Sequence, residues 1–187
     1  MNYQNMLCLG DSQTFGARSY GCYPLYLAQM LTDESPYKWR TINHAVNGYR
    51  ARDLWFLLNH TIDGIQDTFQ ACVLIGTNDV GEASSPELFA EYYRQILRTL
   101  FIRRYKAVFC GEIPYVFADG HVFFAKSTTP LRDQFNGIIQ QVAQEFPRAT
   151  IVRFPSLNRE DYEDAVHFNE SGNIKAAQAF KEAILRR

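Results

Sequence analysis

The sequence predicts an α/β protein: a three-layer α/β/α sandwich around a five-stranded parallel sheet. Five short apolar runs alternate with segments whose apolar residues recur every three or four positions, as on one face of a helix. The runs lack polar residues at alternate positions, which is typical of strands buried on both faces of a parallel sheet. Parallel crossovers are right-handed and need covering helices, so the helices should lie on both faces. A chain of 187 residues is too short for two typical domains, and we predict one domain over residues 1–187.

The five apolar runs are the expected strands. They are Asn5–Leu9, Arg40–Ala45, Ala71–Ile75, Ala107–Glu112 and Thr150–Phe154. Three of the four cysteines fall inside these runs, and no two cysteines form a C-x-x-C pair. We therefore expect reduced thiols that pack as small apolar groups, and no metal site.

The helices between these strands carry their own start and stop signals. Ser85-Pro86 and Thr129-Pro130 each combine a capping residue with proline at the first helical position. Pro147 ends the second of these helices. The expected helices are Pro24–Leu31, Arg50–Leu58, one from Ser85 to about Phe101, one from Thr129 to Pro147 and one from about Ser171.

Composition and charge exclude several classes of function. The formal net charge is −1, so no basic field favours nucleic acid or an anionic membrane. No apolar run approaches the ~18 residues of a membrane-spanning helix. The first residues also lack the basic region of a signal peptide, and we expect a cytoplasmic protein without membrane insertion.

Short polar motifs follow the first, third and fifth expected strands. They are Gly10-Asp11-Ser12-Gln13-Thr14-Phe15-Gly16, Gly76-Thr77-Asn78-Asp79 and Asp164-Ala165-Val166-His167. The carboxyl ends of parallel strands share one edge of the sheet, where sites form. We therefore expect three segments far apart in the sequence to meet there.

These motifs contain the parts of a nucleophilic site. The hydroxyl of Ser12 needs a base to take its proton, and the imidazole of His167 can be that base. Asp164, three residues earlier, can hold one ring nitrogen and stabilise the imidazolium. Candidate donors to an oxyanion are the Ser12 N–H, the Asn78 amide and the Gly48 N–H.

Structural roles remain open for the same residues. Ser12 could cap a helix, and Asn78 and Gly48 could be turn residues. Asp11 and Asp79 are interpreted as residues that brace their loops, without a chemical role.

The four segments together resemble the SGNH hydrolases of the GDSL esterase/lipase family. Gly10-Asp11-Ser12 matches the first block of that family, Gly48 the second, Gly76-Thr77-Asn78-Asp79 the third and Asp164-Ala165-Val166-His167 the last. The resemblance implies a flavodoxin-like α/β/α fold with Ser12 as nucleophile. It also implies hydrolysis of a small-molecule ester or thioester through an acyl-enzyme, without a metal or organic cofactor.

Two other functions fit the same residues. One is acyl transfer to an alcohol or amine from the same acyl-enzyme, and the other is a non-catalytic flavodoxin-like binding module. The Gly-x-Ser-x-Gly elbow of larger α/β-hydrolases is absent, as are nucleotide-binding fingerprints. No oligomeric state follows from the sequence.

An aromatic segment, Tyr115–Phe124, follows the fourth expected strand and should lie over the same edge. Phe117, Phe123 and Phe124 are candidates for binding the acyl or aryl part of a substrate, either as a pocket wall or as a flap. The alternative is that these rings pack against the edge of the sheet.

Overall fold

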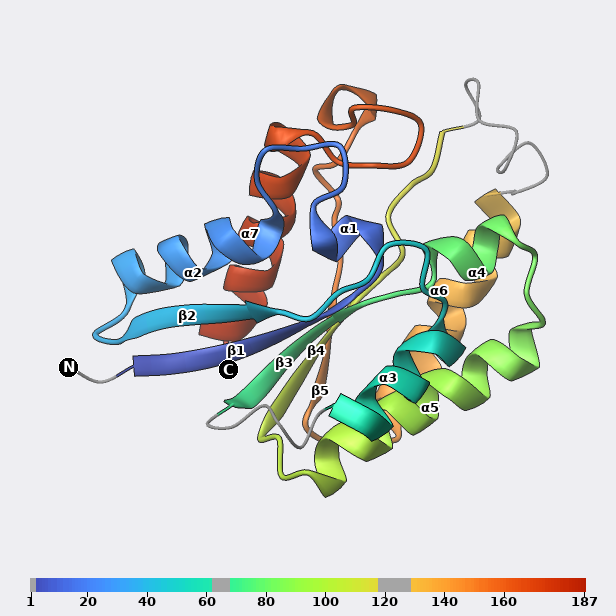
Figure 1. The fold of residues 1–187 in the computed structure, drawn as a ribbon, viewed down its shortest axis with the longest axis horizontal. Helices are drawn as coiled ribbons and strands as arrows, with labels where there is room; N and C mark the ends of the chain where they lie inside the picture. The colour runs from blue at the N-terminus through green and yellow to red at the C-terminus, as the bar shows by residue number, and fades with distance from the viewer. Residues whose placement is uncertain (1–2, 62–67, 118–128) are drawn as a thin grey trace.

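A parallel five-stranded sheet forms the centre of the molecule (Figure 1). The structure is a computed structural model that describes residues 3–61, 68–117 and 129–187. The strands are β1 (Tyr3–Gly10), β2 (Lys38–Asn43), β3 (Thr68–Leu74), β4 (Ala107–Gly111) and β5 (Ala149–Val152). Their order is β2-β1-β3-β4-β5, and every neighbouring pair is parallel, which confirms the predicted sheet.

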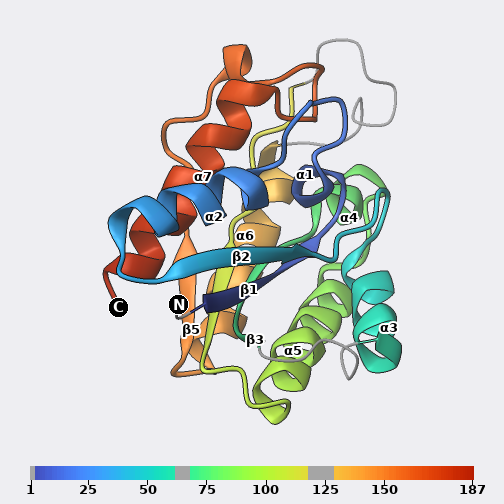
Figure 2. The same cartoon turned by 60° about the vertical axis from the view of Figure 1, so that its left-hand side comes forward.

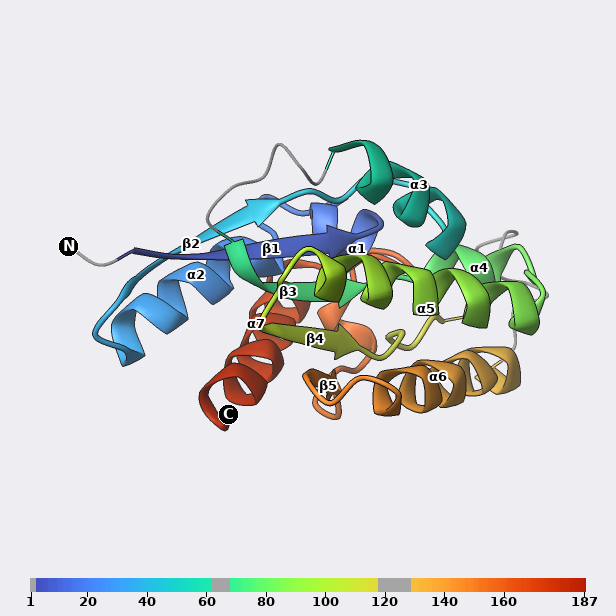
Figure 3. The same ribbon diagram turned by 90° about the horizontal axis from the view of Figure 1, so that it is seen from below.

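Helices cover both faces of this sheet, as expected. The longer ones are α2 (Tyr23–Glu34), α3 (Ala51–Thr61), α5 (Pro86–Ile102), α6 (Thr129–Gln144) and α7 (Glu170–Leu185). Figure 2 shows α2 and α7 side by side on one face, and Figure 3 shows α3, α5 and α6 in a row on the other. Both faces of the central strands are therefore buried.

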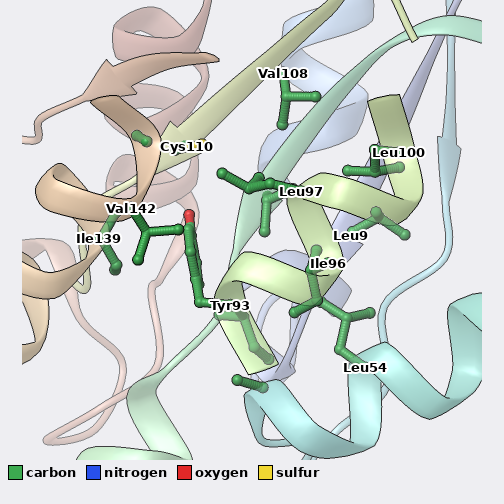
Figure 4. Packing of buried hydrophobic residues seen from close by; sticks show 14 of the residues in the cluster. Leu9, Leu54, Tyr93, Ile96, Leu97, Leu100, Val108, Cys110, Ile139 and Val142 are labelled. Carbon is green, nitrogen blue, oxygen red and sulfur yellow. The ribbon is translucent and has the colours of Figure 1, made fainter. Parts of the chain in front are cut away.

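The larger core cluster joins α3, α5 and α6 to the sheet. Helix α5 contributes residues spaced three and four apart, which form one apolar face (Figure 4). These residues are Tyr93, Ile96, Leu97 and Leu100, and their neighbours include Leu54 of α3, Ile139 and Val142 of α6, and Val108 of β4. On the opposite face, the rings of Tyr23 in α2 and Phe180 in α7 stack with centroids 4.8 Å apart.

Strand β2 departs from the sequence prediction. It was expected at Arg40–Ala45 with both faces buried, but it spans Lys38–Asn43 and consists of exposed and half-buried residues. The reason is its place at the edge of the sheet, where β1 covers only one side. Strand β5 lies at the other edge and is also only partly buried.

Two short helices at the carboxyl edge of the sheet position the polar motifs. Helix α1 (Ser12–Phe15) follows β1, and α4 (Thr77–Gly81) follows β3. The sequence did not predict α4, because a single turn is too short to show helical periodicity. Within the described ranges, no helix combines the length and the apolarity needed to cross a bilayer.

Candidate active site

The turn from β1 into α1 places Ser12 at the start of a helix. A Cβ atom on Gly10 would lie 2.2 Å from both the Leu74 carbonyl oxygen and Thr14 Oγ1, so only glycine fits there. Asp11 caps the helix by accepting the Gln13 N–H at 3.0 Å. Ser12 is the first helical residue, and its N–H has no partner inside the helix for that reason.

The loop before α7 brings His167 to this serine. His167 Nε2 lies 3.1 Å from Ser12 Oγ, although the two residues are 155 positions apart in the sequence. His167 Nδ1 lies 2.8 Å from Asp164 Oδ2 and 3.1 Å from Oδ1. When Nδ1–H donates to this carboxylate, Nε2 carries the lone pair and can accept the serine proton.

Asp164 also fixes the loop that carries the histidine. Its Oδ1 accepts the backbone N–H groups of Val166 at 2.8 Å and His167 at 2.7 Å. Partial burial opposes ionisation, but the hydrogen bonds from His167 and Val166 outweigh it and hold the pKa of Asp164 below its ordinary value. Arg18 adds a distant positive charge, with Nε 3.9 Å from Asp164 Oδ2. The carboxylate is therefore charged at neutral pH.

The predicted oxyanion donors lie on the neighbouring segments. Asn78, in α4, donates one of its two amide hydrogens to the Tyr49 carbonyl at 2.9 Å. The loop that contains Tyr49 is tied to the end of β1 by the Val46 N–H, which donates to Gly10 O at 3.2 Å. The segments after β1, β2 and β3 thus meet at one edge of the sheet. The sequence analysis expected the segments after the first, third and fifth strands there, and the contact between His167 and Ser12 joins the fifth to the first.

Gly48 lies at the third position of a four-residue turn in this loop. Tyr49 N–H donates to Val46 O at 3.3 Å and closes the turn. The φ of Gly48 is +79°, a conformation that favours glycine. A Cβ there would meet no protein atom within 4 Å, so the turn rather than crowding by the protein explains this glycine.

The carboxyl groups of Asp11 and Asp79, which are adjacent in the sequence to Ser12 and Asn78, are buried. Burial is the main cause that raises the pKa of Asp11 to about 7 and the pKa of Asp79 to about 6. Asp79 Oδ2 accepts the Ala51 N–H at 2.9 Å and so braces the start of α3. Both residues therefore make the loop-bracing contacts that the sequence analysis expected of them.

Of the three aromatic candidates, only Phe117 lies within the described residues. Phe123 and Phe124 lie outside them, and the prediction for these two residues is untested. Phe117 makes an edge-on contact with Tyr162 at 5.1 Å between centroids, and its N–H donates to Ala165 O at 2.8 Å. The same ring lines a cavity of about 480 Å³ at the carboxyl ends of β4 and β5. Phe117 therefore packs against Tyr162 beside a cavity whose lining includes neither Ser12 nor His167, and its role in binding substrate stays a prediction.

Sequence reasoning missed Gln13, which follows Ser12 directly. Its side chain is 2% exposed and hydrogen-bonds to the carbonyl of Val166 and to the N–H of Phe168. Nothing in the sequence marks this glutamine, because its partners are backbone groups 153 and 155 positions away. Over the part of the chain that the structure describes, no three His, Cys, Asp or Glu side chains form a group that could hold a metal ion.

Comparison with known proteins agrees with this fold. Residues 8–173 match the GDSL-like lipase/acylhydrolase family. A protein of Parabacteroides merdae named as a GDSL-like lipase has 19% identity and a TM-score of 0.81, with 98% of this chain and 96% of that chain covered. A search of curated proteins finds no match.

Two carbohydrate esterases have a similar fold. A variant of Axe2, an acetyl-xylooligosaccharide esterase from Geobacillus stearothermophilus, has 18% identity and a TM-score of 0.77 over 98% of this chain and 95% of its own. Est24, a carbohydrate acetylesterase from Sinorhizobium meliloti, has 14% identity and a TM-score of 0.80 over 98% and 99%.

Proposed function

Because this chain belongs to the GDSL-like lipase/acylhydrolase family, we propose that it is a serine esterase that cleaves a carboxylic ester through an acyl-enzyme on Ser12. The observation that carries the proposal is the 3.1 Å distance between Ser12 Oγ and His167 Nε2, with Asp164 on the other ring nitrogen. A nucleophile, a base and an orienting group at these distances are what acyl transfer to serine requires.

The first half of the reaction forms the acyl-enzyme. His167 Nε2 takes the hydroxyl proton of Ser12 while Oγ attacks the carbonyl carbon of the ester. The charged carboxylate of Asp164 stabilises the imidazolium that results. His167 then gives this proton to the leaving alkoxide, the C–O bond breaks and the alcohol departs.

The second half releases the acyl group. His167 takes a proton from water, whose oxygen attacks the acyl carbon, and returns that proton to Ser12 Oγ as the carboxylic acid leaves. Each attack places negative charge on the carbonyl oxygen. We assign its stabilisation to the Ser12 N–H, the Asn78 amide and the Gly48 N–H.

The substrate is proposed to be a small acyl ester of a soluble alcohol. Two proteins of similar fold are named as esterases of acetylated carbohydrates, which makes acetyl esters the first class to test. We place the part of the substrate remote from the scissile bond against Phe117 and the cavity that it lines. An ester panel that varies the acyl length and the alcohol would identify the preferred class.

The decisive experiment compares Ser12→Ala with Ser35→Ala. Ser35 follows α2, just before the amino end of β2, and is the control. The Ser12 variant should fold and lose nearly all turnover of p-nitrophenyl acetate, whereas the Ser35 variant should match the wild type. Undiminished turnover by the Ser12 variant would refute the proposal.

Acyl transfer uses the same acyl-enzyme, so a second measurement separates it from hydrolysis. Adding an alcohol acceptor to the assay and measuring the new ester tests for transfer. If hydrolysis is the main reaction, most of the acyl group should appear as free carboxylic acid.

A further inference from the structure

We infer that Gln13 is a positioning residue that holds the histidine-bearing loop in register with Ser12. This inference rests on the proposed esterase function. Gln13 lies beside the nucleophile in the chain and bonds the backbone on both sides of His167. Its Nε2 donates to the Val166 carbonyl, and its Oε1 accepts the Phe168 N–H at 3.3 Å.

An amide suits these two partners without any change of protonation. A carbonyl oxygen only accepts and a backbone N–H only donates, so the side chain must offer one donor and one acceptor together. The same requirement fixes which end of the amide carries the nitrogen. An ionised glutamate would lose the donor, and a methionine of similar shape would lose both hydrogen bonds.

The surroundings make these bonds costly to lose. Gln13 is 2% exposed, Val166 3% and Phe168 1%, so water cannot readily replace the missing partner. A buried backbone group without a partner disfavours the conformation that contains it. The loop should therefore shift when the Gln13 amide is removed.

Helix α1 is anchored in two directions by consecutive residues. Thr14 Oγ1 lies 3.5 Å from Leu9 O and 3.4 Å from Leu74 O, and so ties the helix to the sheet. Gln13 ties the same helix to the loop. The position of Ser12 Oγ relative to the sheet and to His167 is thus set by the two residues that follow it in the chain.

Other contacts hold the loop without reaching α1. Glu163 N–H donates to His167 O at 2.9 Å, and Phe117 N–H donates to Ala165 O at 2.8 Å. Asp164 keeps its own bonds to His167. Removing the Gln13 amide should therefore leave the Asp164–His167 pair intact and disturb its alignment with the serine. Misplacement of a catalytic group by about 1 Å can cost on the order of 10²-fold in rate.

The test uses Gln13→Met and Gln13→Glu with Asn173→Leu as a matched control. Asn173 is fully buried, and its amide also bonds two backbone groups: it accepts Tyr23 N–H and donates to Asn169 O, both at 2.9 Å. We expect Gln13→Met to lower kcat on p-nitrophenyl acetate about 10- to 100-fold with KM within about twofold. Gln13→Glu, which keeps the shape and the acceptor, should lie between Gln13→Met and the wild type.

A second readout does not depend on activity. The ring resonances of His167 in an NMR spectrum should be single in the wild type and broadened or split in Gln13→Met, but unchanged in Asn173→Leu. If kcat and the ring resonances of both Gln13 variants match the wild type, the inference is refuted. Equal losses in Gln13→Met and Asn173→Leu would also refute it, since they would indicate only a general loss of stability.

The two proposals can fail separately. A wild-type protein without esterase activity would overturn the proposed function, and the ring resonances would still decide whether Gln13 positions the loop. If Gln13→Met does not fold, Gln13→Glu carries the same comparison.

Discussion

Replacing Asp11 with asparagine should flatten the dependence of stability on pH. Asp11 is fully buried, and burial raises its pKa from 3.8 to about 7. Its Oδ1 caps α1, whereas its Oδ2 has no hydrogen bond of good geometry to any described residue. Thr77 lies close enough to Asp11 to lower its pKa, but this effect offsets only part of the rise in pKa that burial causes. Ionising this carboxyl therefore costs free energy in the folded state. The same group is in water in the unfolded chain, where ionisation carries no such cost.

The sign follows from proton binding. Between pH 4 and 7 the folded state holds the Asp11 proton and the unfolded chain has released it, so the free energy of unfolding falls as pH rises. The stabilisation is complete below pH 3.8 and is lost as pH passes about 7. The difference between the two pKa values corresponds to about 4 kcal/mol. Asparagine keeps the cap oxygen but cannot ionise, so this dependence should disappear.

The assay is urea denaturation followed by circular dichroism from pH 4.5 to 8.5 at constant ionic strength. Asp33→Asn, at an exposed position in α2, is the control and should follow the wild type. Asp79, with a pKa raised to about 6, should leave a smaller residual slope that ends near that pH. Parallel curves for wild type and Asp11→Asn would show that burial of Asp11 does not govern the slope.

Three further changes test the site. Asn78→Ala should lower kcat by about 10²–10³ with little change in KM, because one of the proposed oxyanion donors is lost; a steady-state kcat within a few-fold of wild type would remove Asn78 from that role. Gly48→Ala should destabilise the fold by about 1–2 kcal/mol in urea denaturation, because the positive φ of the turn penalises a Cβ, and an unchanged midpoint would contradict this reading of the turn. Phe117→Ala should reduce kcat/KM for aryl and long-chain esters more than for acetate across an ester panel, whereas equal losses on all esters would point to a folding defect.

Much of the candidate site could be predicted because each of its residues comes shortly after an expected strand in the sequence. Ser12, Asn78 and the Asp164–His167 pair each come after an apolar run, and the carboxyl ends of parallel strands share an edge. The distances could not be predicted, since they depend on how each loop bends. The short helix α4 was missed because one turn has no period to detect.

The sequence by itself determined the α/β class, the parallel sheet and the segments that follow its strands, because apolar periodicity and the alternation of strands with helices can be read along the chain. Only the tertiary structure decided that β2 lies at an edge, that Asp11 is fully buried and that Gln13 bonds to the loop that carries His167. Burial and backbone pairing depend on which distant segments pack together. A glutamine that contacts residues more than 150 positions away therefore leaves no trace in its own neighbourhood.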